Sequence, residues 1–215
     1  ANLGNFGGAI SAVANSRVTF GPGTDVHHNI AAALGGGLYI AAGSSVYARG
    51  RLFIRENRAA SGGGLFARGG HTEDHEHAPS QDHDADVVFE DGVEVRGNIA
   101  TNGGGGMHLA GSTVALRGNV TMVGNKAGRE GGAMKLTEDS VLECVDSVFL
   151  DNVAQSGGAL QLDASTATLS GCALLSNTAI ASSCSSGTNL CGGGGVIAHD
   201  GGSLSLNRSR VEGNM

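Results

Sequence analysis

One repeating unit is clearest in Phe149-Leu150-Asp151-Asn152-Val153-Ala154-Gln155-Ser156-Gly157-Gly158-Ala159-Leu160, and its features return along the whole chain. An apolar residue is followed by an Asn, then by an Ala, and then by two glycines that precede a small and an apolar residue. The last apolar residue recurs at positions 10, 38, 65, 107, 134, 160 and 196, and four of these six spacings are 26 to 28 residues. A fixed period of this length is typical of solenoid proteins.

Between these marks the chain alternates apolar and polar residues over short runs, as in Leu160-Gln161-Leu162 and Ala167-Thr168-Leu169. Such period-two runs indicate strands, and no helical stripe accompanies them. Three short strands in about 27 residues would make one coil, with each strand pairing in parallel with its copy in the next coil. We therefore predict an all-β fold: one domain over residues 1–215, built as a right-handed, single-stranded parallel β-helix (solenoid) of about seven coils.

The composition agrees with a thin, repeated core and excludes some partners. Gly makes up 38 of 215 residues, Pro only 2, and aromatic residues 4%, so the core is expected to consist of small aliphatic side chains. The net charge of −7 argues against nucleic-acid binding, which needs clustered cations. No apolar run approaches the ~20 residues of a spanning helix, so we expect no direct membrane span.

An Asn stands a few residues before the glycines in each coil. At a β-helix turn, stacked Asn side chains can bond to the Asn and the backbone of the next coil. We predict an Asn ladder, and its members are Asn29, Asn57, Asn98, Asn125, Asn152 and Asn177.

Two insertions interrupt the period, at about residues 69–86 and 180–192. Residues 71–84 of the first insertion contain four histidines and five acidic residues, a composition that suits Zn or Ni. The candidate metal ligands are His71, His75, His77 and His83; the alternative is a solvated loop without fixed geometry. The other histidines are expected at the surface or in turns, and no cofactor is expected.

The four cysteines favour an oxidising compartment. Cys184 and Cys191 lie in the second insertion and are expected to form a local disulfide. Cys144 and Cys172 are 28 residues apart, which is one coil, so we expect them to stack at similar positions and to be bridged. The alternative is a set of reduced thiols, with Cys144 and Cys172 packed as small apolar side chains.

Asn119-Val120-Thr121 and Asn207-Arg208-Ser209 are possible glycosylation sites in a eukaryotic source, with Asn119 and Asn207 as acceptors.

The paired motifs, best matched by Gly131-Gly132-Ala133, Gly157-Gly158-Ala159 and Phe149-Leu150-Asp151-Asn152, resemble the GGA and FxxN repeats of chlamydial polymorphic outer membrane proteins. Elsewhere in the chain Gly replaces the Ala, and Val, Leu or Ala replaces the Phe. The resemblance covers nearly the whole chain outside the insertions. It implies a β-helical passenger exposed at a cell surface, with adhesion as the usual role. We accordingly expect an extracellular or cell-surface location.

Enzymatic β-helices that cut polysaccharides need converging carboxylates. The best acidic stripe here, Asp139, Asp163 and Asp200, fits a polar turn, so we expect no catalysis. We predict a structural, adhesin-like segment of a cell-surface or filament protein. Its expected partners are other protein chains, the rest of a longer β-helix met end to end, and cell-surface glycans. Two alternatives remain: a β-helix that binds or cleaves polysaccharides, and metal binding through the His/Asp-rich loop.

Overall fold

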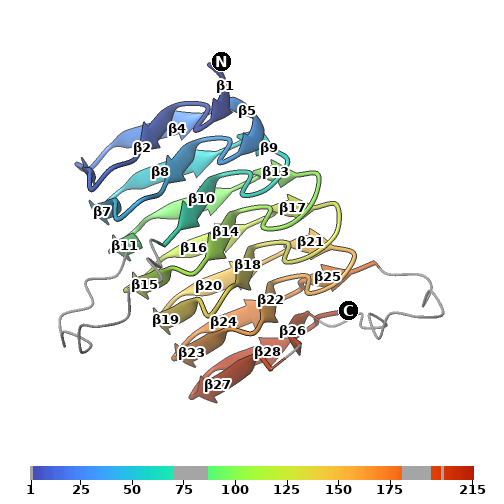
Figure 1. Ribbon diagram of the computed structural model, residues 1–215. Coiled ribbons are helices and arrows are strands. Elements are labelled where there is room, and N and C mark those ends of the chain that lie inside the picture. The colour runs from blue at the N-terminus through green and yellow to red at the C-terminus, as the bar shows by residue number, and fades with distance from the viewer. Residues whose placement is uncertain (1, 70–86, 181–194, 200) are drawn as a thin grey trace, which may run out of the picture.

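A computed structural model describes residues 2–69, 87–180, 195–199 and 201–215 of the chain. These residues form 28 strands and no helix, and so none of them belongs to a helix that could span a membrane. Strands from successive turns pair in parallel and build four sheets of seven strands (Figure 1). The predicted parallel β-helix is confirmed, with six turns of roughly 28 residues separating the first and last strands of each sheet.

We name the sheets A to D in the order in which the chain visits them. Sheet A contains β1 (Leu3–Phe6), β5 (Ile30–Leu34), β9 (Arg58–Ala59), β13 (Ile99–Ala100), β17 (Lys126–Ala127), β21 (Val153–Ala154) and β25 (Thr178–Ala179). Sheet B contains β2 (Ile10–Ala12), β6 (Leu38–Ile40), β10 (Leu65–Arg68), β14 (Met107–Ala110), β18 (Met134–Thr137), β22 (Leu160–Asp163) and β26 (Val196–His199).

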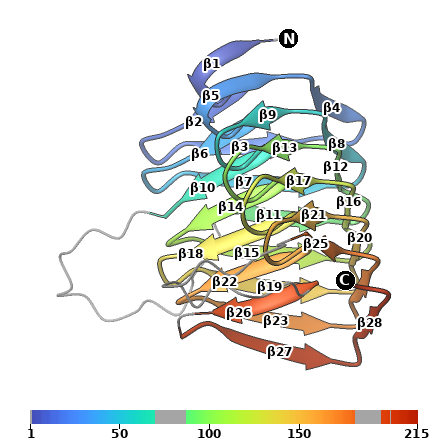
Figure 2. The same cartoon turned by 90° about the vertical axis from the view of Figure 1, so that its right-hand side faces the viewer.

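The other two sheets complete each turn. Sheet C contains β3 (Arg17–Phe20), β7 (Ser45–Arg49), β11 (Val87–Glu90), β15 (Thr113–Arg117), β19 (Val141–Val145), β23 (Thr166–Ser170) and β27 (Ser203–Asn207). Sheet D contains β4 (Thr24–His27), β8 (Leu52–Arg55), β12 (Glu94–Arg96), β16 (Thr121–Val123), β20 (Val148–Leu150), β24 (Ala173–Leu175) and β28 (Arg210–Glu212). Figure 2 shows the same stacking after a 90° turn.

Each turn has four strands, so the expectation of three was wrong. The additional strand is the short one of sheet A, which is only two residues long from β9 to β25. Two residues are too few for an alternating pattern to be recognised in the sequence. The strand forms because the backbone next to the ladder Asn pairs between turns, as in the bond from Arg58 N to Asn29 O at 2.9 Å.

The core is a set of columns in which similar side chains stack from turn to turn. One column in sheet B joins Leu38, Leu65, Met107, Met134 and Leu160, and all five are fully buried. The corresponding column in sheet D contains residues such as Ile54, Met122 and Phe149. Because each side chain stacks on its own equivalent about 4.8 Å away, mainly aliphatic side chains such as Leu, Ile, Val and Met fill the interior.

The glycine pair allows the chain to turn from sheet A to sheet B. Gly131 has a φ of +63°, which is a left-handed conformation that glycine adopts without penalty. A Cβ on Gly132 would lie 2.1 Å from the carbonyl oxygen of Gly158 in the next turn. The first glycine thus serves the bend and the second serves the close approach of neighbouring turns.

The insertions leave the register of the sheets intact. The first lies between β10 and β11, at the corner between sheets B and C, and both strands pair with β14 and β15 of the following turn. The second lies between β25 and β26 at the corner between sheets A and B. Most of both segments falls outside the described residues, as do the metal candidates His71, His75, His77 and His83 and the pair Cys184 and Cys191.

Candidate functional site

The predicted Asn residues form one ladder at the corner between sheets D and A, and Asn214 extends it. Asn125 illustrates the pattern: its Oδ1 accepts hydrogen bonds from the backbone N and the Nδ2 of Asn98, at 3.1 and 3.0 Å. Its own Nδ2 donates to the carbonyl oxygen of Val95 at 2.9 Å and to Oδ1 of Asn152 at 3.0 Å. The amide is fully buried and engaged on both sides. The ladder therefore holds the turns together and has no free group for chemistry.

The residue before each ladder Asn adopts a left-handed conformation throughout. His28, Glu56, Asp151 and Ser176 occupy this position with φ values of 53° to 56°, and Gly97, Gly124 and Gly213 occupy it in the other turns. A non-glycine residue pays about 1–2 kcal/mol for this conformation. The fourfold use of non-glycine residues indicates that the ladder bonds and strand pairing offset this cost.

Two carboxylates converge on the outside of sheet B, but a lysine lies between them. Lys135 Nζ forms an ion pair with Glu130 and lies 3.7 Å from Oδ2 of Asp163. Gln161 Nε2 donates to Oδ1 of Asp163 at 2.8 Å. A glycosidase needs open space between its two carboxyl groups for the sugar. Here the ammonium group fills that space, so the arrangement is that of a supporting ion pair.

The stripe of Asp139, Asp163 and Asp200 is not assembled as a site in the described residues. Asp139 lies in a corner with a φ of +58°, which fits the polar turn, whereas Asp163 belongs to β22. Asp200 falls outside the described residues.

An aromatic row runs along the outside of sheet B next to this ion pair. The rings of Tyr39 and Phe66 stack with centroids 5.9 Å apart, and Phe66 and His108 meet edge to face at 4.9 Å. Phe66 is only 3% exposed. Because the rings cover one another, their faces are not free to stack on a sugar.

His108 does not fit the expectation of a surface or turn histidine. Burial, with smaller contributions from the nearby charges of Lys135 and Arg68, lowers the pKa of His108 to about 3. Its Nε2 lies 3.4 Å from Oγ1 of Thr137, and Nδ1 is the one buried side-chain N or O atom in the described part of the chain that lacks a partner. The ring is therefore neutral near pH 7 and packs as part of the aromatic row.

The outer face of sheet C carries a hollow of about 400 Å³. Tyr47 lies in it and donates a hydrogen bond from its hydroxyl to Oε2 of Glu90 at 2.9 Å, which raises the pKa of Tyr47 above its ordinary value. Arg117 lies 3.8 Å from the same carboxylate, and Arg17 lines the hollow on the other side. Small neighbours shape it: Thr19, Ser45, Val46 and Val88. An aromatic ring, hydroxyls, two guanidinium groups and a carboxylate thus share one open surface.

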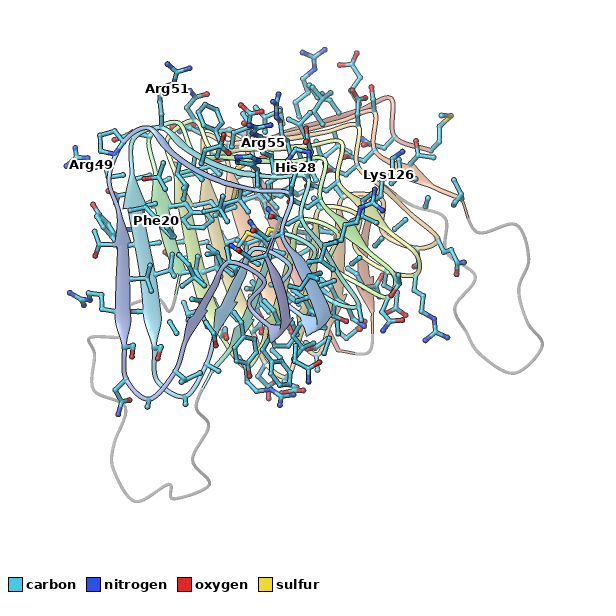
Figure 3. The ribbon with its side chains drawn as sticks, turned by 90° about the horizontal axis from the view of Figure 1, so that it is seen from above. Phe20, His28, Arg49, Arg51, Arg55 and Lys126 are labelled. Carbon is cyan, nitrogen blue, oxygen red and sulfur yellow. The ribbon has the colours of Figure 1, made fainter. Side chains whose placement is uncertain are left out.

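A second hollow of about 600 Å³ lies at the corner between sheets C and D. Arg51 covers the ring of Phe53 there at 5.6 Å, and Glu94 and Asn119 contribute polar groups. Seen down the axis, Arg49 and Arg51 project away from the ribbon, whereas Phe20 lies toward its interior (Figure 3). Asn119 is exposed at this corner and Asn207 is exposed at the end of β27, and their glycosylation stays a prediction.

Charged groups on the outside of sheet D pair across turns. Arg55 donates to both carboxylate oxygens of Asp25, at 3.0 and 2.7 Å, and this bond lowers the pKa of Asp25 and raises that of Arg55. His28 Nε2 lies 2.6 Å from Oε2 of Glu56. In the described ranges no three His, Cys, Asp or Glu side chains are placed to share a metal ion.

The two core cysteines are not stacked at equivalent positions, so that expectation was wrong. Cys144 in β19 pairs with Leu169 in β23, whereas Cys172 follows three residues later at the corner between sheets C and D. The two cysteines are 28 residues apart, which is the length of a typical turn. The turn between β19 and β23 is shorter, because paired residues such as Val141 and Thr166 are only 25 residues apart (166 − 141). Their sulfur atoms nevertheless lie 3.0 Å apart, beyond the length of a disulfide bond.

Comparison with protein-family models, with curated proteins and with solved structures gave no match to this chain.

Proposed function

We propose that this chain is a non-catalytic, extracellular β-helical segment of a cell-surface or filament protein, with an adhesin-like role. The observation that carries the proposal is the unbroken Asn ladder from Asn29 to Asn214, together with parallel pairing in all four sheets. Such pairing stiffens the chain along its axis. Six steps of about 4.8 Å give a described rod of roughly 29 Å, whose sides remain available for contacts.

The motif resemblance to chlamydial polymorphic outer membrane proteins supports the same role and location. It rests on Gly131-Gly132-Ala133, Gly157-Gly158-Ala159 and Phe149-Leu150-Asp151-Asn152. In this proposal the edge strands of the described part, such as β1 and β28, pair with further β-helix turns of the same or another chain, because an unpaired parallel edge readily accepts another strand.

Labelling of intact and permeabilised source cells with an antibody against residues 1–215 tests the location. We expect equal labelling in both samples. Labelling that requires permeabilisation would overturn the extracellular proposal. Electron microscopy of the isolated native protein tests the structural role, and we expect rods or filaments; compact particles without a long axis would contradict it.

Glycan binding is the second candidate function, and the hollow on sheet C favours it. Tyr47 offers a ring, Ser45 and Thr19 offer hydroxyls, and Arg17 and Arg117 offer cations. Sugar sites commonly combine an apolar ring face with a few placed polar groups. The two guanidinium groups favour a sugar that carries a carboxylate.

A glycan array followed by calorimetry tests this function with a matched pair of variants. Tyr47→Ala removes the ring, whereas Thr168→Ala changes a residue in the same outward column of sheet C, three strands beyond Val88. We expect Tyr47→Ala to weaken binding of an acidic glycan by about tenfold or more, equivalent to about 1.4 kcal/mol, and Thr168→Ala to leave it unchanged. Equal affinities for both variants would remove sheet C as the site.

A further inference from the structure

Two thiols from neighbouring turns meet inside the core. The Sγ atoms of Cys144 and Cys172 lie 3.0 Å apart, and each residue is only 1% exposed. The contact is a sulfur-to-sulfur approach between side chains that no solvent molecule separates. This is closer than ordinary packing of two apolar side chains, whose heavy atoms lie at about 3.5–4.0 Å.

The two sulfur atoms meet although their residues are not paired between strands, because Cys172 lies three residues beyond Leu169, the strand partner of Cys144. Cys144 occupies an inward position of β19, between Leu116 and Leu169 in the same column. Cys172 occupies the next inward position beyond Leu169, where the chain turns into sheet D, and the bond from Ala173 N to Ser147 O at 2.9 Å aligns it beside Ser147. A bond between the sulfurs would thus tie one turn to the next through the core.

The surroundings of the pair fit neither a metal site nor a catalytic thiol. Its column neighbours Leu116 and Leu169 are fully buried and apolar. No third ligand in the described ranges joins the two thiols to form a metal site. Neither sulfur is open to a substrate, so a catalytic thiol does not fit.

We propose that Cys144 and Cys172 are a disulfide site, and that the bond forms while the turns close during folding. The inference rests on the oxidising location proposed above. The oxidant is a disulfide of that compartment, either a small-molecule disulfide or the active-site disulfide of an oxidoreductase. Because the folded core excludes reagents, the oxidant must act before the turn that contains β23 and β24 has packed onto the turn that contains Cys144.

The chemistry balances in two exchange steps. The Cys172 thiolate attacks the disulfide of the oxidant, forms a mixed disulfide and releases one thiol of the oxidant. Cys144 then loses its proton and attacks Sγ of Cys172, which releases the second thiol. The two cysteines lose two electrons and two protons, and the oxidant is reduced to two thiols.

Oxidative refolding of the full chain tests the bond independently of its cellular location. The Cys184→Ser/Cys191→Ser variant leaves only the core pair and is refolded in a mixture of oxidised and reduced glutathione. It is then denatured, treated with N-ethylmaleimide and weighed by mass spectrometry. We expect a mass that is lower by two hydrogen atoms and carries no maleimide. Cleavage before Asp146, Asp151 and Asp163 should release a linked pair of peptides.

The matched control adds Cys172→Ser to this variant, because Ser147 and Ser209 occupy the equivalent corner positions in neighbouring turns. It should fold, and the oxidised parent should melt about 5–15 °C above its own reduced form, a difference that the control lacks. Maleimide on both cysteines after refolding to a native circular dichroism spectrum would overturn the proposal. If the bond forms on refolding but the protein isolated from its source is fully reduced, the disulfide site stands and the extracellular location fails.

Discussion

Replacing Asn125 by Ala would test the role of the ladder at its centre. The side chain is fully buried and takes part in four hydrogen bonds. Asn98 Nδ2 would keep its bond to Ile54 O, and Asn152 Oδ1 would keep its bond from the backbone N of residue 125. The backbone N–H of Asn98 and the carbonyl of Val95 would lose these side-chain partners. At about 1–3 kcal/mol for each buried orphan, the expected loss is about 2–6 kcal/mol.

Equilibrium unfolding in urea, followed by circular dichroism, measures this loss. Asn102→Ala is the matched control, since Asn102 is exposed and its backbone, not its side chain, bonds to Ala60 and Arg129. We expect the control to stay within about 0.5 kcal/mol of the wild-type free energy of unfolding. A loss for Asn125→Ala no larger than that of the control would refute the view that the ladder stabilises the stack.

Further predictions concern the glycines and His108. Gly132→Ala should lower the free energy of unfolding by about 3 kcal/mol or more, because the new Cβ would lie 2.1 Å from the carbonyl oxygen of Gly158. Gly124→Asp should lower it by only about 1 kcal/mol, since the space there is open and Asp151 occupies the same position one turn later. Similar losses for the two variants in chemical denaturation would contradict the close approach assigned to Gly132. His108 has a folded-state pKa of about 3 against 6.5 for the free side chain, so the unfolded state binds the extra proton and stability falls as pH drops below 6.5. Between pH 6.5 and 4.5 the free energy of unfolding of the wild type should fall by about 2–3 kcal/mol more than that of His108→Phe, a variant that keeps an aromatic ring in the row. Parallel pH profiles of stability for the two proteins would contradict the lowered pKa of His108.

The fold follows from the sequence because a solenoid repeats one local solution. The ladder Asn and the glycine pair each form the same corner once per turn, so their period alone identifies the turns. The four-stranded turn could not be read in this way, since Val153–Ala154 and its equivalents are too short to show a pattern.

The candidate sites were less accessible to sequence reasoning. Tyr47 and Glu90 are 43 residues apart and are brought together by pairing in sheet C across the first insertion. A signal existed in the repeat itself: aligning Val46 with Val87 as inward residues places Tyr47 beside Val88 on the outside and Glu90 two positions further along the same strand. Arg17 and Arg117 join them from turns before and after, which only the register of the sheet determines.

The parallel β-helix, the Asn ladder and the glycine corners could be predicted from the residues alone, because these features depend on contacts between a residue and its own equivalent one period away. Contacts between unlike residues became visible only in the folded chain. Cys144 faces Cys172 on a diagonal because this turn is shorter than the usual period. His108 is half-buried, with its Nδ1 atom enclosed, because its ring packs against Phe66 of the aromatic row. Such contacts depend on small differences in turn length and on the side chains of neighbouring turns. A repeat pattern contains neither, because it describes only what the turns have in common.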